Sequence, residues 1–154
     1  MYKKKPLFIV FEGIEGSGKS YLSKKLYKDL MKRNFHAVLT REPGGTIRAE
    51  KIRQIILNDY FLKKNNEKFH KYTDTLLYLA ARNEHLENKI KPALLQKKIV
   101  ICDRFVDSTI AYQSYGMGIP KKIIYLINSY LVSKYKPHFT FLNIVNKKNL
   151  FNNS

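Results

Sequence analysis

The sequence contains little of what builds disulfide-linked, metal-clustered or membrane-spanning proteins. Cys102 is its only cysteine, which excludes a disulfide within the chain and a cysteine metal cluster. No run of about 18 apolar residues occurs, so we expect no membrane-spanning helix. The apolar stretch Leu7–Phe11 after the basic start is too short for a signal-peptide core. We therefore expect a cytoplasmic protein, and 154 residues are enough for one domain with its own core.

Acidic residues are also scarce. There are 12 Asp and Glu against 29 Lys and Arg, which gives a formal net charge of +17. Such an excess can serve nucleic-acid binding, because cations neutralise backbone phosphates. The lysines are spread over every segment, however, and Asn and Ile are plentiful. We interpret the charge first as a compositional bias, second as attraction of anionic nucleotides, and only third as a nucleic-acid interface.

The most informative stretch joins a strand, a glycine-rich loop and a helix. Leu7–Phe11 has the length and residue types of a buried strand, and a helical pattern follows with Leu22, Leu26 and Leu30 four residues apart. Between them the chain fits G-x-x-x-x-G-K-[ST] at Gly13, Ile14, Glu15, Gly16, Ser17, Gly18, Lys19 and Ser20. In this motif Lys19 reaches the β- and γ-phosphates and Ser20 ligates Mg²⁺. The sequence therefore predicts a nucleoside triphosphate site for ATP and Mg²⁺.

Further strands and helices alternate along the chain. We predict strands at 37–41, 99–103 and 139–144, helices at 49–57, 74–90 with a continuation at 92–96, 108–112 and 121–134, and loops at 59–72 and 115–118. This alternation indicates an α/β fold in which helices cover both faces of an open parallel sheet. The ligand of such a fold binds at the carboxyl ends of the strands. We find no linker or repeat, and expect a single domain over 1–154.

Several polar residues are placed where such a ligand would bind. Arg41 and Arg104 come at the ends of predicted strands, so we expect both guanidiniums to hold a second anion opposite the triphosphate. Asp103 ends the third strand and can assist the loop in binding Mg²⁺. Tyr78 and Arg82 share one face of a helix, where a ring and a guanidinium can hold a nucleobase. Surface salt bridges, a structural hydrogen bond, and a core ring beside a surface charge remain the alternatives.

Four segments carry a family resemblance. FEGIEGSGKS, TREPGGT with EKIR shortly after it, LAARNEHL and CDRFVDSTIAYQ follow one another in the order and spacing of bacterial thymidylate kinases. The sequence resembles that family from Leu7 to about Ile144, and the second and fourth segments are far more specific than the phosphate loop. The resemblance implies a P-loop nucleoside monophosphate kinase fold, phosphorylation of dTMP to dTDP with Mg-ATP for dTTP synthesis, and a homodimer.

The resemblance also implies roles for the matching residues. Together with Asp103, which its place at a strand end already suggested, the catalytic set is Lys19, Glu15, Arg41, Arg104 and Asp103, with Ser20 and Asp103 as Mg²⁺ ligands. The implied dTMP-binding set is Glu15, Arg41, Pro43, Arg53, Tyr78, Arg82, Arg104, Thr109, Tyr112 and Gln113. In this set the two arginines at the strand ends hold the phosphate, Tyr78 stacks on thymine, and Thr109 and Gln113 bond the base. Tyr112 favours deoxyribose, Arg53 and Arg82 line the base pocket, and a cis bond precedes Pro43.

The sequence departs from the family pattern in length and at a few positions. The resemblance implies a longer chain, so we expect the lid, the last strand and the closing helix to be missing. Gly16 stands where some members carry an arginine, which implies a lid-dependent enzyme, and Lys147 and Lys148 are the only tail cations. Met117 replaces a common arginine. A truncated remnant that binds dTMP or ATP with little turnover is thus one alternative, and a kinase for another nucleotide or a deoxynucleoside is a second.

Overall fold

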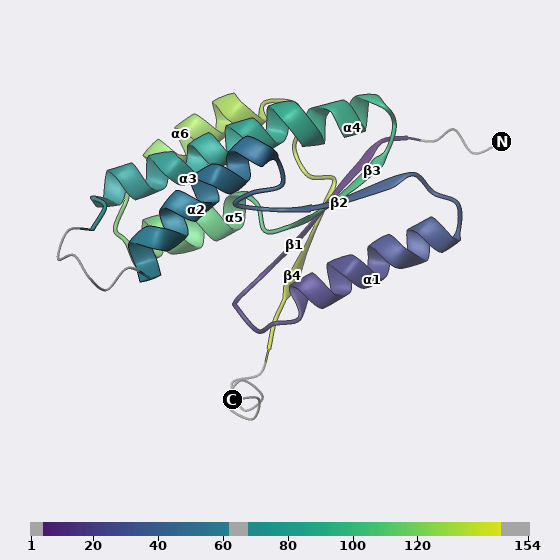
Figure 1. Ribbon diagram of the computed structural model, residues 1–154, viewed down its shortest axis with the longest axis horizontal. Helices are drawn as coiled ribbons and strands as arrows, with labels where there is room; N and C mark the ends of the chain where they lie inside the picture. The colour runs from purple at the N-terminus through teal and green to yellow at the C-terminus, as the bar shows by residue number, and fades with distance from the viewer. Residues whose placement is uncertain (1–4, 62–67, 146–154) are drawn as a thin grey trace.

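A four-stranded parallel sheet forms the centre of the computed structural model, which describes residues 5–61 and 68–145. The strands are β1 (Leu7–Gly13), β2 (Ala37–Arg41), β3 (Ile99–Asp103) and β4 (Phe139–Asn143) (Figure 1). They lie side by side in the order β2-β3-β1-β4. All three pairings are parallel. The predicted α/β fold with an open parallel sheet is therefore confirmed, and all four expected strands are present.

Alternate side chains of β1 point to opposite faces of the sheet, and each face has its own core. Phe8 and Val10 pack on one side with the chain's longer helical layer. Ile9 and Phe11 pack on the other side, against Leu26 and other residues of α1 (Lys19–Lys32). Figure 1 shows α1 alone on its side of the strands. Burial on both faces explains why β1 and β3 are continuous apolar runs instead of alternating ones.

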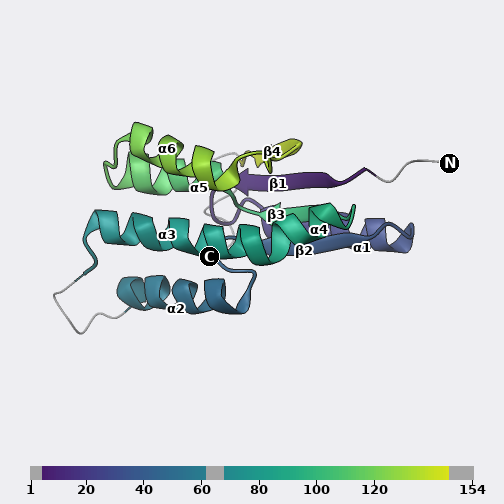
Figure 2. The ribbon, with the colours of Figure 1, turned by 90° about the horizontal axis from the view of Figure 1, so that it is seen from above.

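The helical layer on the opposite face contains all the described helices except α1. Its elements are α2 (Ile47–Phe61), α3 (Lys71–His85), a π-helical turn (Leu86–Ile90), α4 (Lys91–Leu95), α5 (Val106–Thr109), a π-helical segment (Ile110–Gly116) and α6 (Lys121–Val132). In Figure 2, α3 lies between α2 and α6. None of the helices described in residues 5–61 and 68–145 is long and apolar enough to cross a membrane.

The predicted loops are where the sequence interpretation was wrong. The loop expected at 59–72 is helical at both ends, because α2 continues to Phe61 and α3 begins at Lys71. Residues 62–67 lie outside the described part. The loop expected at 115–118 is also shorter, since the π-helical segment includes Tyr115 and Gly116. The helix predicted at 74–90 does continue through 92–96, with a π-helical turn between its two parts.

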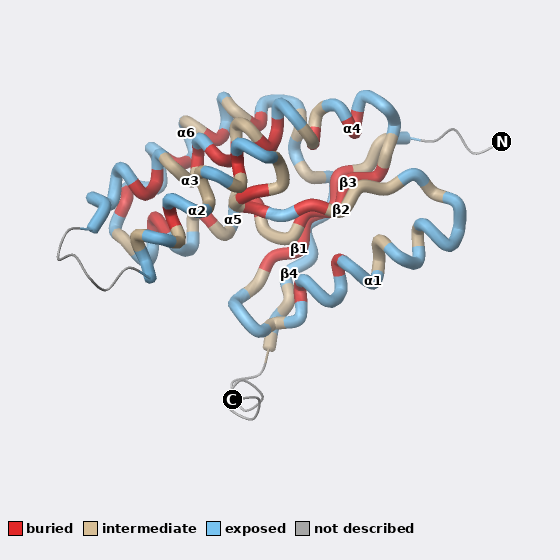
Figure 3. Tube along the Cα trace, in the orientation of Figure 1, coloured by how far each residue is buried: buried red, intermediate tan, exposed pale blue. Residues whose placement is uncertain are grey.

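The strands differ sharply in burial (Figure 3). In β3, Ile99, Val100, Ile101 and Cys102 are all buried, whereas four of the five residues of β4 are exposed. The strand register explains why the polar residues gather at one end of the sheet. Phe11 pairs with Asp103 and Asp103 with Arg41, while Gly13 pairs with Asn143. These positions all lie at the carboxyl ends of the strands, where ligands of open parallel sheets bind.

Candidate active site

The glycine loop between β1 and α1 approaches β4 so closely that Gly13 has no room for a side chain. A Cβ at Gly13 would lie 2.7 Å from the Asn143 carbonyl oxygen and 2.7 Å from Ser17 Oγ. The amide of Asn143 in turn donates to the Ser17 carbonyl oxygen at 3.3 Å. Gly18, the residue before α1, has φ +81°, a left-handed conformation that glycine adopts without strain. The loop therefore leads directly into a helix N-terminus whose free N–H groups can bind an anion.

Lys19 begins α1 and folds back over the loop. Its Nζ donates to the Ile14 carbonyl oxygen at 2.9 Å, and its side chain is buried. Burial lowers the pKa of this ammonium and the positive charge of Arg104 adds to the effect, while Asp103 and Glu15 oppose it. The loop thus holds a cation beside its own free N–H groups, as a site for polyphosphate requires.

Ser20 and Asp103 lie together beside the loop and fit a bound Mg²⁺. The Ser20 hydroxyl donates to Asp103 Oδ2. The other carboxylate oxygen, Oδ1, is buried and has no hydrogen-bond partner in the described part of the chain. Within residues 5–61 and 68–145 no cluster of three His, Cys, Asp or Glu side chains could hold a metal alone. A metal here would therefore need phosphate oxygens as further ligands, which suits Mg²⁺.

The turn after β3 directs Arg104 across the sheet toward the loop. Arg104 has φ +70°, an uncommon conformation for a residue with a side chain, and its N–H donates to the Phe11 carbonyl oxygen at 2.9 Å. Its Nη1 donates to the Gly13 carbonyl oxygen at 3.2 Å and to Ser108 Oγ at 3.1 Å. The guanidinium lies 5.4 Å from the centre of the Tyr112 ring. Arg104 consequently connects the phosphate loop to the next helix.

The carboxylate of Glu12 holds the turn after β3 in place through hydrogen bonds. Its Oε1 accepts from the N–H of Phe105 at 2.7 Å and from that of Ser108 at 3.3 Å, and its Oε2 accepts from Ser108 Oγ at 2.5 Å. These bonds satisfy free N–H groups at the start of α5. Burial raises the pKa of Glu12, although the hydrogen bonds from Ser108 and Phe105 act against the rise.

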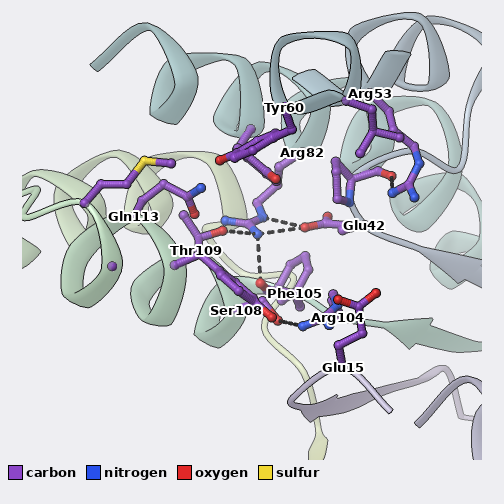
Figure 4. A pocket seen from close by; sticks show the side chains of 16 residues that line it. Glu15, Glu42, Arg53, Tyr60, Arg82, Arg104, Phe105, Ser108, Thr109 and Gln113 are labelled. Atoms are coloured by element: carbon purple, nitrogen blue, oxygen red, sulfur yellow. Dashed lines mark hydrogen bonds and ion pairs between the residues drawn. The ribbon is translucent and has the colours of Figure 1, made fainter. Parts of the chain in front are cut away.

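A cavity of about 460 Å³ opens between the loop and the helical layer (Figure 4). It is lined by Glu15, Glu42, Pro43, Arg53, Leu57, Tyr60, Tyr78, Arg82, Arg104, Phe105, Ser108, Thr109, Tyr112, Gln113, Gly116 and Met117. All the residues that the resemblance assigns to dTMP are therefore in its walls, with the exception of Arg41. The volume lies in the range of small-molecule sites.

Arg82 is the centre of a buried network in the cavity wall. Its Nε donates to Glu42 Oε2 at 2.8 Å, and its Nη1 donates to Asn128 Oδ1 at 2.7 Å. Its Nη2 donates to the Phe105 carbonyl oxygen at 2.9 Å and to Thr109 Oγ1 at 2.8 Å (Figure 4). These contacts use four of the five N–H groups of a guanidinium. Arg82 therefore acts mainly as a structural residue that positions Thr109 and the turn after β3.

Glu42 is the counter-ion of this network. It is buried, and its Oε1 also contacts His85 Nδ1 at 3.1 Å. Burial alone would raise the pKa of Glu42, but Arg82 and His85 hold that pKa below its ordinary value. The peptide bond between Glu42 and Pro43 is cis, as the resemblance implied, and the Pro43 carbonyl oxygen accepts from Arg53 Nη1 at 3.1 Å.

Two aromatic rings and one amide in the cavity wall are placed to contact a ligand. Tyr78 is half-buried, and burial raises the pKa of its hydroxyl. Tyr112 is about half exposed and faces Arg104. Gln113 is buried and its Nε2 donates to Asp74 at 3.2 Å, while its Oε1 has no partner among the described residues. The cavity therefore offers flat rings and an unused acceptor, which suit a planar heterocycle.

Arg41 is not in this cavity. Its Nη2 forms an ion pair with Glu50 at 3.1 Å, and it lines a second cavity of about 570 Å³ that also contains Ser20 and Asp103. The expectation that Arg41 and Arg104 face the same space is thus not met by this arrangement. Glu50 keeps Arg41 in place and is itself fixed, since it accepts from the N–H of Gly45 at 2.8 Å. This is the surface salt bridge that the sequence left open.

Sequence reasoning assigned no role to several residues that build the site. Glu42, Phe105 and Ser108 lie within segments that carry the resemblance, so that signal was available. Tyr60 and Asp74 gave no local signal, because Tyr60 fell in a predicted loop and Asp74 in an ordinary helix start. Met117, a departure from the family pattern, lines the cavity. Lys147 and Lys148 lie outside the described residues.

Comparisons with known proteins agree with this geometry. A family model described as thymidylate kinase matches residues 11–152. The thymidylate kinase of Aster yellows witches'-broom phytoplasma (strain AYWB) is 47% identical over 135 residues, which are 88% of this chain and 62% of that protein. The thymidylate kinase of Clostridium novyi (strain NT) is 43% identical over 136 residues, which are 88% of this chain and 64% of that protein. This chain spans less than two thirds of the length of these relatives.

A solved structure extends the similarity to three dimensions. The crystal structure of thymidylate kinase from Ehrlichia chaffeensis matches with a TM-score of 0.80 and 42% sequence identity. The match covers 90% of this chain and 75% of that one. The similarity in fold therefore extends over most of this chain.

Proposed function

Because the chain belongs to the thymidylate kinase family, we propose that it transfers the γ-phosphoryl group of Mg-ATP to dTMP, forming dTDP for dTTP synthesis. One observation carries the proposal. The cavity contains Glu15 of the phosphate loop at one end and the buried pair Thr109 and Gln113 at the other. A nucleotide with its base against the buried pair would direct its phosphate toward the loop. Donor and acceptor phosphates would then meet where Arg104 spans the two.

The triphosphate side of the reaction uses residues 13–20 and Asp103. Backbone N–H groups of the loop and the Lys19 ammonium bind the donor phosphates. Ser20 and Asp103 would hold Mg²⁺, and the unpartnered Oδ1 of Asp103 supports this assignment. Mg²⁺ held there would supply positive charge to neutralise the phosphates. The Lys19 ammonium lies against the loop and can stabilise the negative charge that develops on the leaving oxygen.

The acceptor side uses Arg104, with Glu15 and Arg41 beside it. Arg104 binds the dTMP phosphate and brings one of its oxygens in line with the γ-phosphorus. That oxygen is already an anion, so no strong general base is required. Arg41 contributes a second cation once it leaves Glu50, and Glu15 lies near the phosphate and the sugar. Catalysis in this scheme is positioning and charge neutralisation.

The base and sugar are held by the walls of the cavity. Tyr78 stacks on thymine, and the free acceptor of Gln113 takes the N3–H of the base. Thr109 accepts from Arg82, which leaves its hydroxyl proton for the base. Tyr112 narrows the space around the sugar and favours deoxyribose, while Arg53 and Pro43 close the side of the pocket.

A homodimer is part of the proposal, and apolar side chains on α6 support it. Leu126 is 69% exposed, Tyr125 53% and Tyr130 85%, and all three are on this one helix. Exposed apolar side chains that gather on one surface are typical of association sites. Light scattering on the purified chain would test it: a mass of one 18.1 kDa chain contradicts the dimer, and Tyr130→Glu should convert a dimer to that mass.

The decisive experiment measures ADP release by the 154-residue chain with Mg-ATP and dTMP, dUMP, dCMP or no acceptor. We expect release that depends on dTMP and is weaker with dCMP. Thermal stabilisation by dTMP without any ADP release would instead indicate a nucleotide-binding protein and contradict the proposed activity. Equal release without an acceptor would indicate ATP hydrolysis, and release with another acceptor alone would assign a different nucleotide.

A further inference from the structure

The side-chain amide of Gln113 is held on one side and free on the other. Gln113 is 1% exposed and lies in the π-helical segment Ile110–Gly116, which forms one wall of the cavity. Its Nε2 donates to Asp74 Oδ2 at 3.2 Å. Its Oε1 is buried without a hydrogen-bond partner in the described part of the chain. An unpartnered buried acceptor at a ligand cavity is costly unless a ligand supplies the missing donor.

Asp74 decides which end of this amide is free. An ionised carboxylate accepts hydrogen bonds and cannot donate them, so only the NH₂ end of Gln113 can face Asp74. The carboxylate is itself fixed, because Asp74 is 3% exposed in the first turn of α3 and its Oδ1 accepts from the Tyr60 hydroxyl at 3.4 Å. The reversed amide would place two acceptors against each other.

We propose that Asp74 is a positioning residue that sets base selectivity by fixing the Gln113 amide, so that only an acceptor faces the base. This inference rests on the proposed function and adds to it the residue that enforces the selectivity for the base. A pyrimidine with an N–H at position 3, such as thymine or uracil, satisfies Gln113 Oε1. Cytosine carries a lone pair at that position and would leave two acceptors facing each other.

The test is Asp74→Asn, which keeps size and shape. An asparagine amide can either accept from Gln113 or donate to it, so Gln113 becomes free to turn its NH₂ toward the base. Binding of dTMP and of 5-methyl-dCMP is measured by calorimetry without ATP, because these two nucleotides differ only at positions 3 and 4 of the ring. We expect the ratio of their affinities to fall by about tenfold or more, the usual worth of one base-reading hydrogen bond.

Asp59→Asn is the matched control. It removes a negative charge near Asp74 without touching Gln113, since Asp59 Oδ1 accepts from the Phe69 N–H instead. The affinity ratio should stay at the wild-type value in this variant. If the role of Asp74 were purely structural, Asp74→Asn would weaken the binding of both nucleotides equally and leave the affinity ratio unchanged. That result overturns the proposal.

The double variant Asp74→Asn/Gln113→Glu provides the rescue. The introduced asparagine can donate to one oxygen of the introduced glutamate, whose other oxygen again presents an acceptor to the base, so the preference for dTMP should return. If Asp74→Asn does not fold, the double variant is compared with Gln113→Glu alone, in which two carboxylates meet. Gln113→Glu alone should melt at a lower temperature than the double variant, and equal melting temperatures overturn the proposal. Failure of the wild-type chain to bind dTMP overturns the proposed function as well, whereas an unchanged ratio overturns this inference alone.

Discussion

The phosphate loop and the base pocket of this protein are built in opposite ways. The loop is one contiguous stretch, and Ser17 Oγ in it and Oδ1 of the neighbouring Asp103 have no partner in the described residues, as is also true of Gln113 Oε1 and Asn128 Nδ2 at the pocket. The pocket takes Glu42, Arg82 and Thr109 from three separate segments and bonds them to one another. Substitutions in the loop should therefore change chemistry with little effect on stability. Substitutions in the pocket should first change stability.

The largest effect should follow from removing the counter-ion of the pocket. Glu42→Leu leaves the buried guanidinium of Arg82 without a charge partner and deprives His85 of its contact. Breaking a buried ion pair on one side typically costs about 3–5 kcal/mol of unfolding free energy. Urea unfolding measures this loss. The control is Glu42→Gln, which keeps an acceptor for Arg82 and should lose less unfolding free energy than Glu42→Leu. Equal stability of Glu42→Leu and the wild-type chain would mean that the network does not support the fold.

Lys19→Ala should give the converse result. Among the described residues the Lys19 ammonium makes one hydrogen bond, to a loop carbonyl oxygen, so we expect melting close to that of the wild-type chain. Removing one charged donor from a site of developing charge usually lowers kcat by about 10²–10³. Steady-state ADP release with dTMP measures this, and Lys28→Ala, on an exposed position of the same helix, is the control. Turnover equal to that of the control would remove Lys19 from the mechanism.

The same contrast explains what the sequence could predict. The loop was predictable because its chemistry is local: Gly13, Gly18, Lys19 and Ser20 carry it within eight positions. Strands β1 and β3 were predictable as well, since burial on both faces produces apolar runs of strand length. These features depend on neighbours in the sequence.

Most of the pocket was predictable only through the family resemblance, although the helix spacing alone had already paired Tyr78 with Arg82. Glu42 depends on Arg82, which is 40 residues away in the sequence, and no local pattern joins them. Tyr60 was missed because the polar composition around it indicates a loop, whereas packing of α2 against α3 keeps it helical. A surface salt bridge was one alternative for Arg41, but its pairing with Glu50 could not be predicted, because the position of a strand end does not determine which way a long side chain turns.

A smaller effect should separate the two strand-end arginines. Arg104 spans loop and pocket, so Arg104→Ala should weaken dTMP binding by the usual worth of a charged hydrogen bond, about 1.5–3 kcal/mol. Arg41 is engaged with Glu50 on the surface, and exposed ion pairs contribute about 0–1 kcal/mol to stability. Arg41→Ala should therefore melt like the wild-type chain and lose less dTMP affinity. Calorimetric titration compares the two, and an equal loss would mean that Arg41 leaves Glu50 fully when dTMP binds.

The smallest effect lies in the pH dependence of stability, where Glu12 and Glu42 should act with opposite signs. Burial raises the pKa of Glu12, so the folded state binds its proton more tightly than the unfolded state does. The resulting contribution is fully present below the ordinary carboxyl pKa of about 4.3 and is lost as the pH rises through the raised value. Arg82 and His85 lower the pKa of Glu42 against the effect of burial. Its contribution is present above the ordinary value and is lost as the pH falls through the lowered one.

Urea unfolding from about pH 3 to pH 8 of the wild-type chain, Glu12→Gln and Glu42→Gln would measure both contributions. The stability difference between wild type and Glu12→Gln should shrink as the pH rises, whereas the difference between wild type and Glu42→Gln should grow. Asp74, whose pKa is also raised by burial, is present in all three proteins and cancels in both differences. If both stability differences changed with pH in the same direction, Glu42 would not be ion-paired in solution. The pocket would then lack the charge network that distinguishes it from the loop.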